Sequence, residues 1–207
     1  RVIYQLDNLD FEVTGKESVI AELEVARAYW YYILCEAFGN VPIVDRFDVP
    51  EGFLPETSSR EEVFAFIENS IKNNVDKLSD DTKTYYGRFN KWNAKMLLAR
   101  LYLNAESWIG KNMYTECMAL CTEIMNSNKY ALENDYSAPF YAQNEGSQEI
   151  IFAYPADEVK TGSTIYMALQ KTLHPSNVKT FNLQTWLDNG VCAVPTFIDT
   201  YEEGDKR

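Results

Sequence analysis

The sequence predicts a mainly α-helical protein, in which tetratricopeptide-like helical hairpins are followed by a small β-hairpin and long irregular loops. Two observations predict this fold class. Before residue 130, apolar residues recur every three or four positions in four segments, which is the period of amphipathic helices. Beyond residue 130, two short β-prone runs and a long irregular segment replace that period. We therefore divide the chain into a helical scaffold, residues 1–130, and a hairpin and loop region, residues 131–207, as the probable ligand-binding side.

The first predicted helix covers residues 16–38. One face of it repeats at helical spacing, in Val19, Leu23, Ala26, Trp30, Ile33 and Ala37. From Val25 onward the segment is apolar nearly all round, so we expect it in the centre of the fold, with Trp30 in the core. Gly39 is expected to end the helix, and Pro42 prevents it from resuming.

The second helix is predicted to begin at a capping box, Ser59 to Glu62, after an extended surface loop over residues 45–57. In such a box the serine oxygen caps an early amide, and the glutamate side chain reaches back to the cap residue. The apolar stripe of this helix consists of Val63, Ile67, Ile71, Val75 and Leu78.

Two further helices are predicted, one capped by Asn90 and one capped by Asn112. A connection of only about half a dozen residues favours an antiparallel pair. Two successive helical hairpins indicate a tetratricopeptide-like stack. Trp92 and Trp108, near the ends of the third helix, are interpreted as packing residues.

After residue 130, a hairpin is predicted from two β-prone runs, residues 149–154 and 163–167, separated by a turn-rich stretch. Residues 173–194 show no regular period but contain aromatic residues, which argue against disorder and favour a functional loop. Pro195 is expected to start a short helix that reaches Tyr201.

Charge and composition exclude several classes of protein. The formal net charge is −12, which disfavours binding to nucleic acid or to an anionic membrane surface and suits a neutral ligand such as a sugar. The four cysteines show no zinc-binding spacing, and we interpret them as small buried apolar residues. No apolar segment is long enough to span a bilayer. The chain opens at Arg1 and stops within a charged run, so we expect both ends to be truncated.

Catalytic motifs are lacking: the sequence has no HExxH, GxSxG, phosphate-binding glycine loop or Cys/His nucleophile pattern. We predict no catalytic residue, no metal site and no cofactor. A pair of acidic residues that converge only in space stays open, because glycoside hydrolysis needs two such carboxylates.

A sugar site is predicted around Trp186, Asp188 and Asn189. The C–H face of a pyranose packs on an aromatic face, while carboxylates and amides bond its hydroxyl groups. In the alternative interpretation, Trp186 anchors its loop to the core. Further candidates for the same site are Lys160, Tyr166 and His174, the single histidine.

Several motifs occur in the order found in the SusD/RagB family, which the chain resembles over nearly its whole length. They are Ala26-Arg27-Ala28-Tyr29-Trp30-Tyr31-Tyr32, Phe38-Gly39-Asn40-Val41-Pro42-Ile43-Val44, Ser58-Ser59-Arg60-Glu61-Glu62-Val63, Gly87-Arg88, Leu98-Ala99-Arg100-Leu101-Tyr102-Leu103, Ser147-Gln148-Glu149-Ile150-Ile151-Phe152, and Asn189-Gly190 before Pro195-Thr196-Phe197.

The resemblance implies a surface lipoprotein that binds glycans without cleaving them. Such proteins are lipid-anchored at the extracellular face of the outer membrane and deliver oligosaccharides to a TonB-dependent transporter of the SusC type. The lipid anchor would lie outside this sequence, which would represent an internal part of a longer chain.

The sequence departs from the starch-binding member of the family at two positions. That member has a tryptophan directly after an Asn-Gly pair, where this chain has Val191, and a tyrosine before a Gly-Ser-Thr turn, where this chain has Thr161. Starch is therefore a doubtful ligand, and Trp186 would supply a different aromatic platform. Two alternatives to glycan capture are a tetratricopeptide-like scaffold for a protein partner and a helical glycan-cleaving enzyme.

Overall fold

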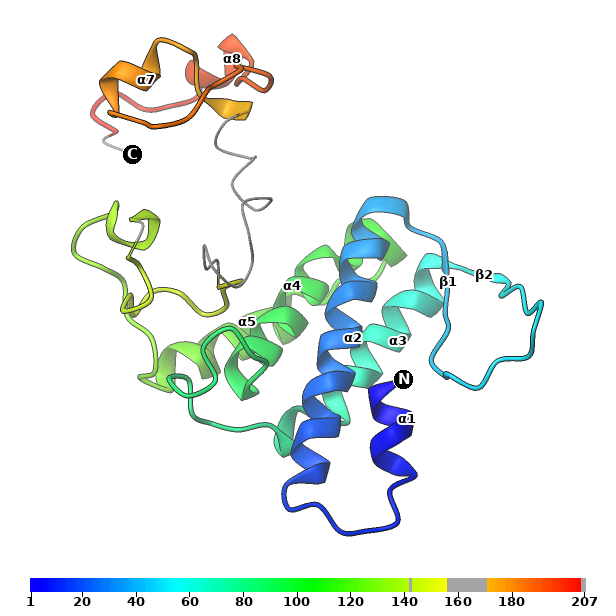
Figure 1. The fold of residues 1–207 in the computed structure, drawn as a ribbon. Coiled ribbons are helices and arrows are strands. Elements are labelled where there is room, and N and C mark those ends of the chain that lie inside the picture. Colours follow the sequence, from blue (N-terminus) through cyan, green and yellow to red (C-terminus); the bar gives the residue numbers. More distant parts are fainter. Residues whose placement is uncertain (142, 156–170, 206–207) are drawn as a thin grey trace. The chain divides into compact units, whose positions relative to one another are not determined.

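The computed structural model describes residues 1–141, 143–155 and 171–205, which fall into two compact units (Figure 1). The first unit is Arg1–Ala153 and the second is Tyr154–Arg207. Residues 131–153, which the sequence analysis placed with the loops, belong to the first unit. The mainly α-helical character is confirmed, with helices α1 Val2–Asp7, α2 Lys16–Phe38, α3 Arg60–Lys72, α4 Lys91–Ile109, α5 Tyr114–Asn126, α7 Asn177–Thr180 and α8 Pro195–Ile198.

Helix α2 begins and ends at the predicted residues, and Gly39 ends it. The Gly39 amide donates to the Cys35 carbonyl at 2.9 Å, and the Gly39 backbone has φ 74° and ψ −89°. A Cβ atom at this position would lie 2.8 Å from Nη2 of Arg60. The backbone conformation therefore favours glycine here, and a Cβ would also displace the neighbouring guanidinium.

Trp30 does not lie in the core, so that prediction is wrong. Its side chain is 57% exposed, while the inward face of α2 is made by Ala21, Val25, Ala28, Tyr31, Tyr32 and Cys35. Trp30, Leu34 and Phe38 follow one another at four-residue spacing and form an exposed stripe on α2. A helix that is apolar nearly all round does not reveal from its sequence which face packs inward.

A sheet of two short strands closes the loop after α2. Strand β1, Val41–Pro42, pairs antiparallel with β2, Thr57–Ser58. The Tyr31 hydroxyl accepts a hydrogen bond from the Val44 amide at 2.8 Å and donates to the Val44 carbonyl at 3.3 Å. A buried side chain of α2 thus holds the start of this loop.

The small sheet is not where the sequence predicted it. Residues 149–154 form no strand, and the predicted partner, residues 163–167, lies outside the described residues. Phe152 stacks on Phe89 with ring centroids 4.8 Å apart and also contacts Tyr29. The apolar residues that made this run look like a strand instead anchor an irregular segment to the helical core.

Helix α3 begins at the predicted capping box: the Ser59 Oγ accepts from the Glu62 amide, and Glu62 accepts from the Ser59 amide at 2.7 Å. The helix ends at Lys72, before the predicted stripe does. The side chain of Asn74 donates to the Ser70 carbonyl at 2.8 Å, a local bond that competes with continued helix. A 3₁₀ turn follows, and Leu78 is still buried.

Helices α4 and α5 pack together, as α2 packs with α3. The predicted cap of α4 is confirmed: Asn90 Oδ1 accepts from the amides of Trp92 and Asn93, and Asn93 Oδ1 accepts from the Asn90 amide. Asn112 accepts from the Tyr114 amide at 3.3 Å, but Met113 is the residue that precedes the first turn of α5.

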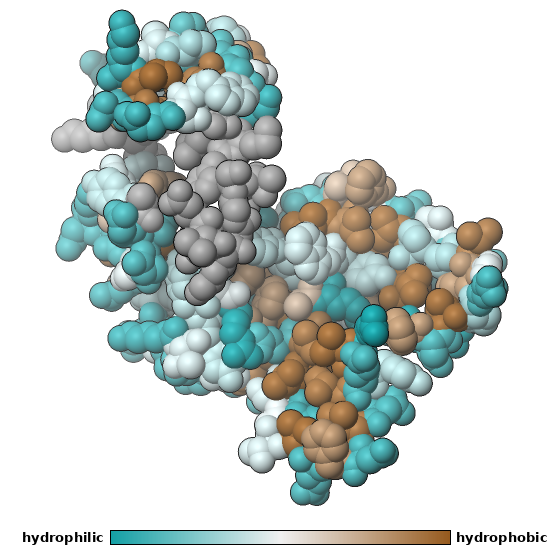
Figure 2. Space-filling model, viewed as in Figure 1, coloured by the Kyte–Doolittle hydropathy of each residue, from teal (hydrophilic) through white to brown (hydrophobic). Residues whose placement is uncertain are grey.

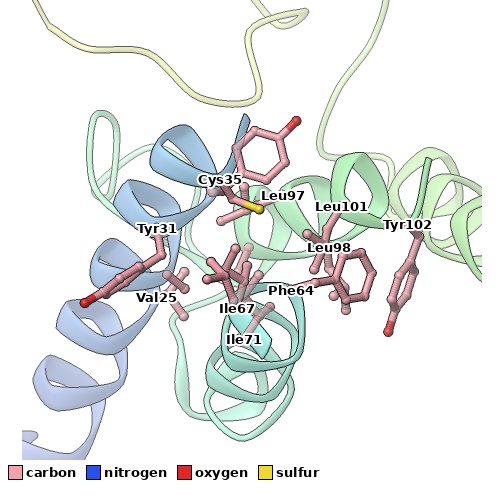
Figure 3. Packing of buried hydrophobic residues seen from close by; sticks show 14 of the residues in the cluster. Val25, Tyr31, Cys35, Phe64, Ile67, Ile71, Leu97, Leu98, Leu101 and Tyr102 are labelled. Carbon is pink, nitrogen blue, oxygen red and sulfur yellow. The ribbon is translucent and has the colours of Figure 1, made fainter. Parts of the chain in front are cut away.

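The core lies where α2, α3 and α4 meet (Figure 3). Side chains from all three helices converge there, among them Val25, Ile67 and Leu101, which are fully buried. Tyr102, at its edge, donates to the Glu68 carboxylate at 2.8 Å, and burial raises the pKa of Tyr102. Apolar surface also remains exposed over α1 and the neighbouring part of α2 (Figure 2).

The cysteines differ in their environments. Cys35 is buried, Cys117 and Cys121 are half-buried, and Cys192 is exposed, so the expectation of small buried residues fails for Cys192. Among the described residues, no helix has the length and apolar character needed to cross a bilayer.

Candidate functional site

Three of the predicted sugar-binding residues, Trp186, Asp188 and Asn189, lie together in the second unit, on the segment that follows α7. Leu187 between them is only 7% exposed, whereas Trp186 is 57% exposed. The loop thus buries Leu187 and leaves the indole of Trp186 accessible. Leu187, rather than Trp186, therefore anchors this loop.

Lys171 completes this group. Its Nζ lies 2.7 Å from Asp188 Oδ2 and 5.9 Å from the centroid of the Trp186 ring. The hydrogen bond from Lys171 holds the pKa of Asp188 below its ordinary value of 3.8, so the carboxylate is ionised at neutral pH. We call Lys171, Trp186, Asp188 and Asn189 the Trp186 group.

Backbone hydrogen bonds hold the two segments of the Trp186 group side by side. The Asn189 amide donates to the Leu173 carbonyl at 3.2 Å, and the Val191 amide donates to the Lys171 carbonyl at 2.8 Å. Asn189 itself has φ 51°, a left-handed conformation that asparagine adopts more readily than most residues. The Asn189 turn thus places Asp188 opposite Lys171, and the Gly190 amide donates to the other carboxylate oxygen at 3.3 Å.

Of the other three predicted residues, only His174 is described, and its printed contacts are with the turn before α7. The His174 Nδ1 lies 2.8 Å from Ser176 Oγ and accepts from the Ser176 amide at 3.2 Å. The His174 carbonyl accepts from the Asn177 amide at 2.8 Å, so this residue shapes the turn before α7. Lys160 and Tyr166 lie outside the described residues.

Sequence reasoning missed Lys171. It stands 17 residues before its partner Asp188, in no recognisable motif, and only the pairing of the two segments brings the residues together. No pattern in the sequence marks Lys171 as a neighbour of Trp186, because the contact depends on the pairing of two segments that are distant in sequence.

The chemistry of the Trp186 group suits a polar, uncharged ligand. The indole offers an apolar face, the Lys171 ammonium donates, the Asp188 carboxylate accepts, and the Asn189 amide does both. No group of three or more His, Cys, Asp or Glu side chains gathers as a metal site within residues 1–141, 143–155 and 171–205.

Comparison with known proteins finds similarity to the SusD-like family. Residues 3–103 match a SusD-like family described as "Starch-binding associating with outer membrane". The starch-binding protein SusD of Bacteroides thetaiotaomicron is 30% identical over 156 residues, which are 71% of this chain and 27% of that protein. The chain thus spans about a quarter of the length of this curated relative.

Solved structures show the same fold. A laminarin-binding SusD-like protein matches with a TM-score of 0.65 and 22% identity, covering 73% of this chain and 33% of that one. Surface glycan-binding protein A of Bacteroides thetaiotaomicron, in complex with laminarihexaose, matches with a TM-score of 0.62 and 23% identity, covering 76% and 32%. These similarities confirm the predicted fold class.

Proposed function

Because the chain belongs to the SusD-like family, we propose that it is part of a cell-surface protein that captures oligosaccharides without cleaving them. The observation that supports this most directly is the exposed indole of Trp186, with Lys171 and Asp188 fixed beside it by a 2.7 Å ion pair. The relatives are named for binding starch, laminarin or laminarihexaose and not for catalysis, so we assign no catalytic step to the chain.

The ligand is proposed to stack on Trp186. Lys171 and Asp188 would bond hydroxyl groups at the rim of the sugar ring, since one donates and the other accepts. Lys160, Tyr166 and His174 remain proposed contributors to the same site. Val191 offers no flat face after the Asn-Gly pair, which supports a glycan other than starch.

Delivery to a transporter is the second part of the proposal. The whole protein would sit at the extracellular face of the outer membrane through a lipid anchor and pass oligosaccharides to a SusC-like TonB-dependent transporter. The family description, which names association with the outer membrane, supports that location. Co-purification of the transporter from detergent-solubilised membranes, together with protease access on intact cells, tests it.

Electrophoresis through native gels that contain laminarin, starch or other polysaccharides tests the binding function. Retardation by at least one glycan relative to a non-binding control protein is expected. Equal migration in every gel would contradict glycan capture.

A tetratricopeptide-like scaffold for a protein partner is the second candidate function. The exposed stripe of Trp30, Leu34 and Phe38 on α2 favours it, because contiguous exposed apolar side chains mark interaction surfaces. A stable protein partner that is lost in Leu34→Asp and unaffected by sugars would support this function over glycan capture.

A further inference from the structure

A cavity of about 390 Å³ lies within the first unit, between the loop that precedes α4 and residues 145–153. Its volume is in the range of small-molecule sites. Tyrosine and amide side chains, among them Tyr86, Tyr130 and Gln148, line it together with apolar residues such as Ile150 and Ile151. The cavity shares no residue with the Trp186 group.

A wider groove of about 750 Å³ adjoins this cavity. The two share their lining at Thr82, Lys83, Lys129, Gly146 and Gln148, so the cavity opens directly into the groove. A partly open cavity that continues as a wider groove fits a chain-like ligand whose end enters the cavity.

The hydroxyl of Tyr130 is buried and forms no hydrogen bond of normal geometry among the described residues, although the Asn90 side chain lies close enough to lower the Tyr130 pKa. Burial raises the pKa of Tyr130 to about 12, so the group is a neutral hydroxyl at physiological pH. Leaving such a group unpaired is costly, and buried polar atoms normally have a partner. A ligand rich in hydroxyl groups would supply the missing bond.

Charges around the cavity are mixed. Lys83 and Glu145 carry opposite signs, and the Lys129 ammonium lies 3.2 Å from the Asp80 carboxylate. This balance gives an anion or a cation no strong preference. The lining mixes apolar faces with hydroxyl and amide groups, and a purely apolar ligand would leave those polar groups without partners. The lining suits a neutral polyhydroxyl compound.

We propose that this cavity is a second glycan site, which binds the end of a neutral oligosaccharide while the rest of the ligand lies in the adjoining groove. The ligand class rests on the proposed function, whereas the position of the site is inferred from the cavity, the groove and the buried Tyr130 hydroxyl.

Two substitutions test the site without touching the Trp186 group. Tyr130→Phe removes only the hydroxyl, and loss of one such bond should weaken binding about fivefold. Gly146→Phe fills the junction of cavity and groove, where a Cβ meets no atom within 4 Å, and should abolish binding there. Tyr114→Phe is the control, because its hydroxyl donates to Glu106 at 2.6 Å and does not line the cavity.

Isothermal titration calorimetry decides whether the cavity is a second glycan site. Laminarihexaose and maltohexaose are titrated into the parent chain, these variants and Trp186→Ala. The proposal predicts a binding event that is weakened by Tyr130→Phe, lost in Gly146→Phe and retained in Trp186→Ala and Tyr114→Phe. Binding that Trp186→Ala abolishes and both cavity variants leave unchanged overturns the second site and leaves the proposed function standing. Absence of binding by the parent chain to either hexasaccharide overturns the second site, while the native gels decide the proposed function separately.

Discussion

Replacing Gly39 by alanine should destabilise the protein far more than the same change at Gly110, although each glycine follows a helix. Gly110 has φ 69° and ψ 16°, and a Cβ there meets nothing within 4 Å. The left-handed conformation costs alanine about 1–2 kcal/mol. Reduced freedom of the unfolded chain offsets about 0.4–1 kcal/mol of that, so Gly110→Ala should cost about 1 kcal/mol.

Gly39 adds two costs. Its φ 74° and ψ −89° fall in a region that is strained for alanine by roughly 1–3 kcal/mol. The new Cβ would also meet Arg60 Nη2 at 2.8 Å and displace a guanidinium that lies 5.8 Å from the centroid of the Trp108 ring, a contact worth about 0.5–1 kcal/mol. Gly39→Ala should therefore cost about 3 kcal/mol.

Urea unfolding followed by far-ultraviolet circular dichroism measures both losses. The midpoints can be compared if the slope of the unfolding free energy against urea concentration is the same in both variants. Equal losses of unfolding free energy in the two variants would refute the reasoning, because neither the ψ angle of Gly39 nor its contact with Arg60 would then add to the cost.

Three smaller predictions follow from other contacts. Asn90→Ala removes both cap bonds at the start of α4 and should lower the unfolding free energy by about 1–2 kcal/mol in the same urea experiment. Tyr31→Phe leaves the backbone of Val44 without its two partners, so limited proteolysis should cut the following loop faster. Lys171→Met should raise the pKa of Asp188 toward 3.8, as measured from carboxyl chemical shifts. Because the ion pair stabilises only the ionised carboxylate, its contribution to folding stability is present above pH 3.8. That contribution is lost as the pH falls through the lowered pKa. An unchanged titration midpoint would contradict the pairing.

Local signals predicted much of the scaffold. The capping box at Ser59, the cap at Asn90, the ends of the helix over residues 16–38 and the stop at Gly39 all depend on neighbours within one or two turns, and the structure confirms them. Such features are set by backbone hydrogen bonds and φ preferences that the sequence displays directly.

Features that depend on tertiary packing were not predictable in the same way. Trp30 lies on a helix with apolar residues all round, so its exposure is decided by which face meets α3 and α4. Phe152 packs on Phe89 and Tyr29 rather than forming a strand, and Lys171 meets Asp188 only because two loop segments pair. In each case the deciding partner is distant in sequence.

The central claim, that Trp186 carries glycan binding, is tested most directly by isothermal titration of Trp186→Ala against Trp30→Ala. Both indoles are 57% exposed, so the control removes an equally accessible tryptophan from the first unit. The titration uses a glycan that retards the chain in gels, in the Gly146→Phe background that blocks the cavity. We predict at least about a tenfold loss of affinity for Trp186→Ala and no more than about a twofold change for Trp30→Ala. Equal affinities in the two variants would contradict the account.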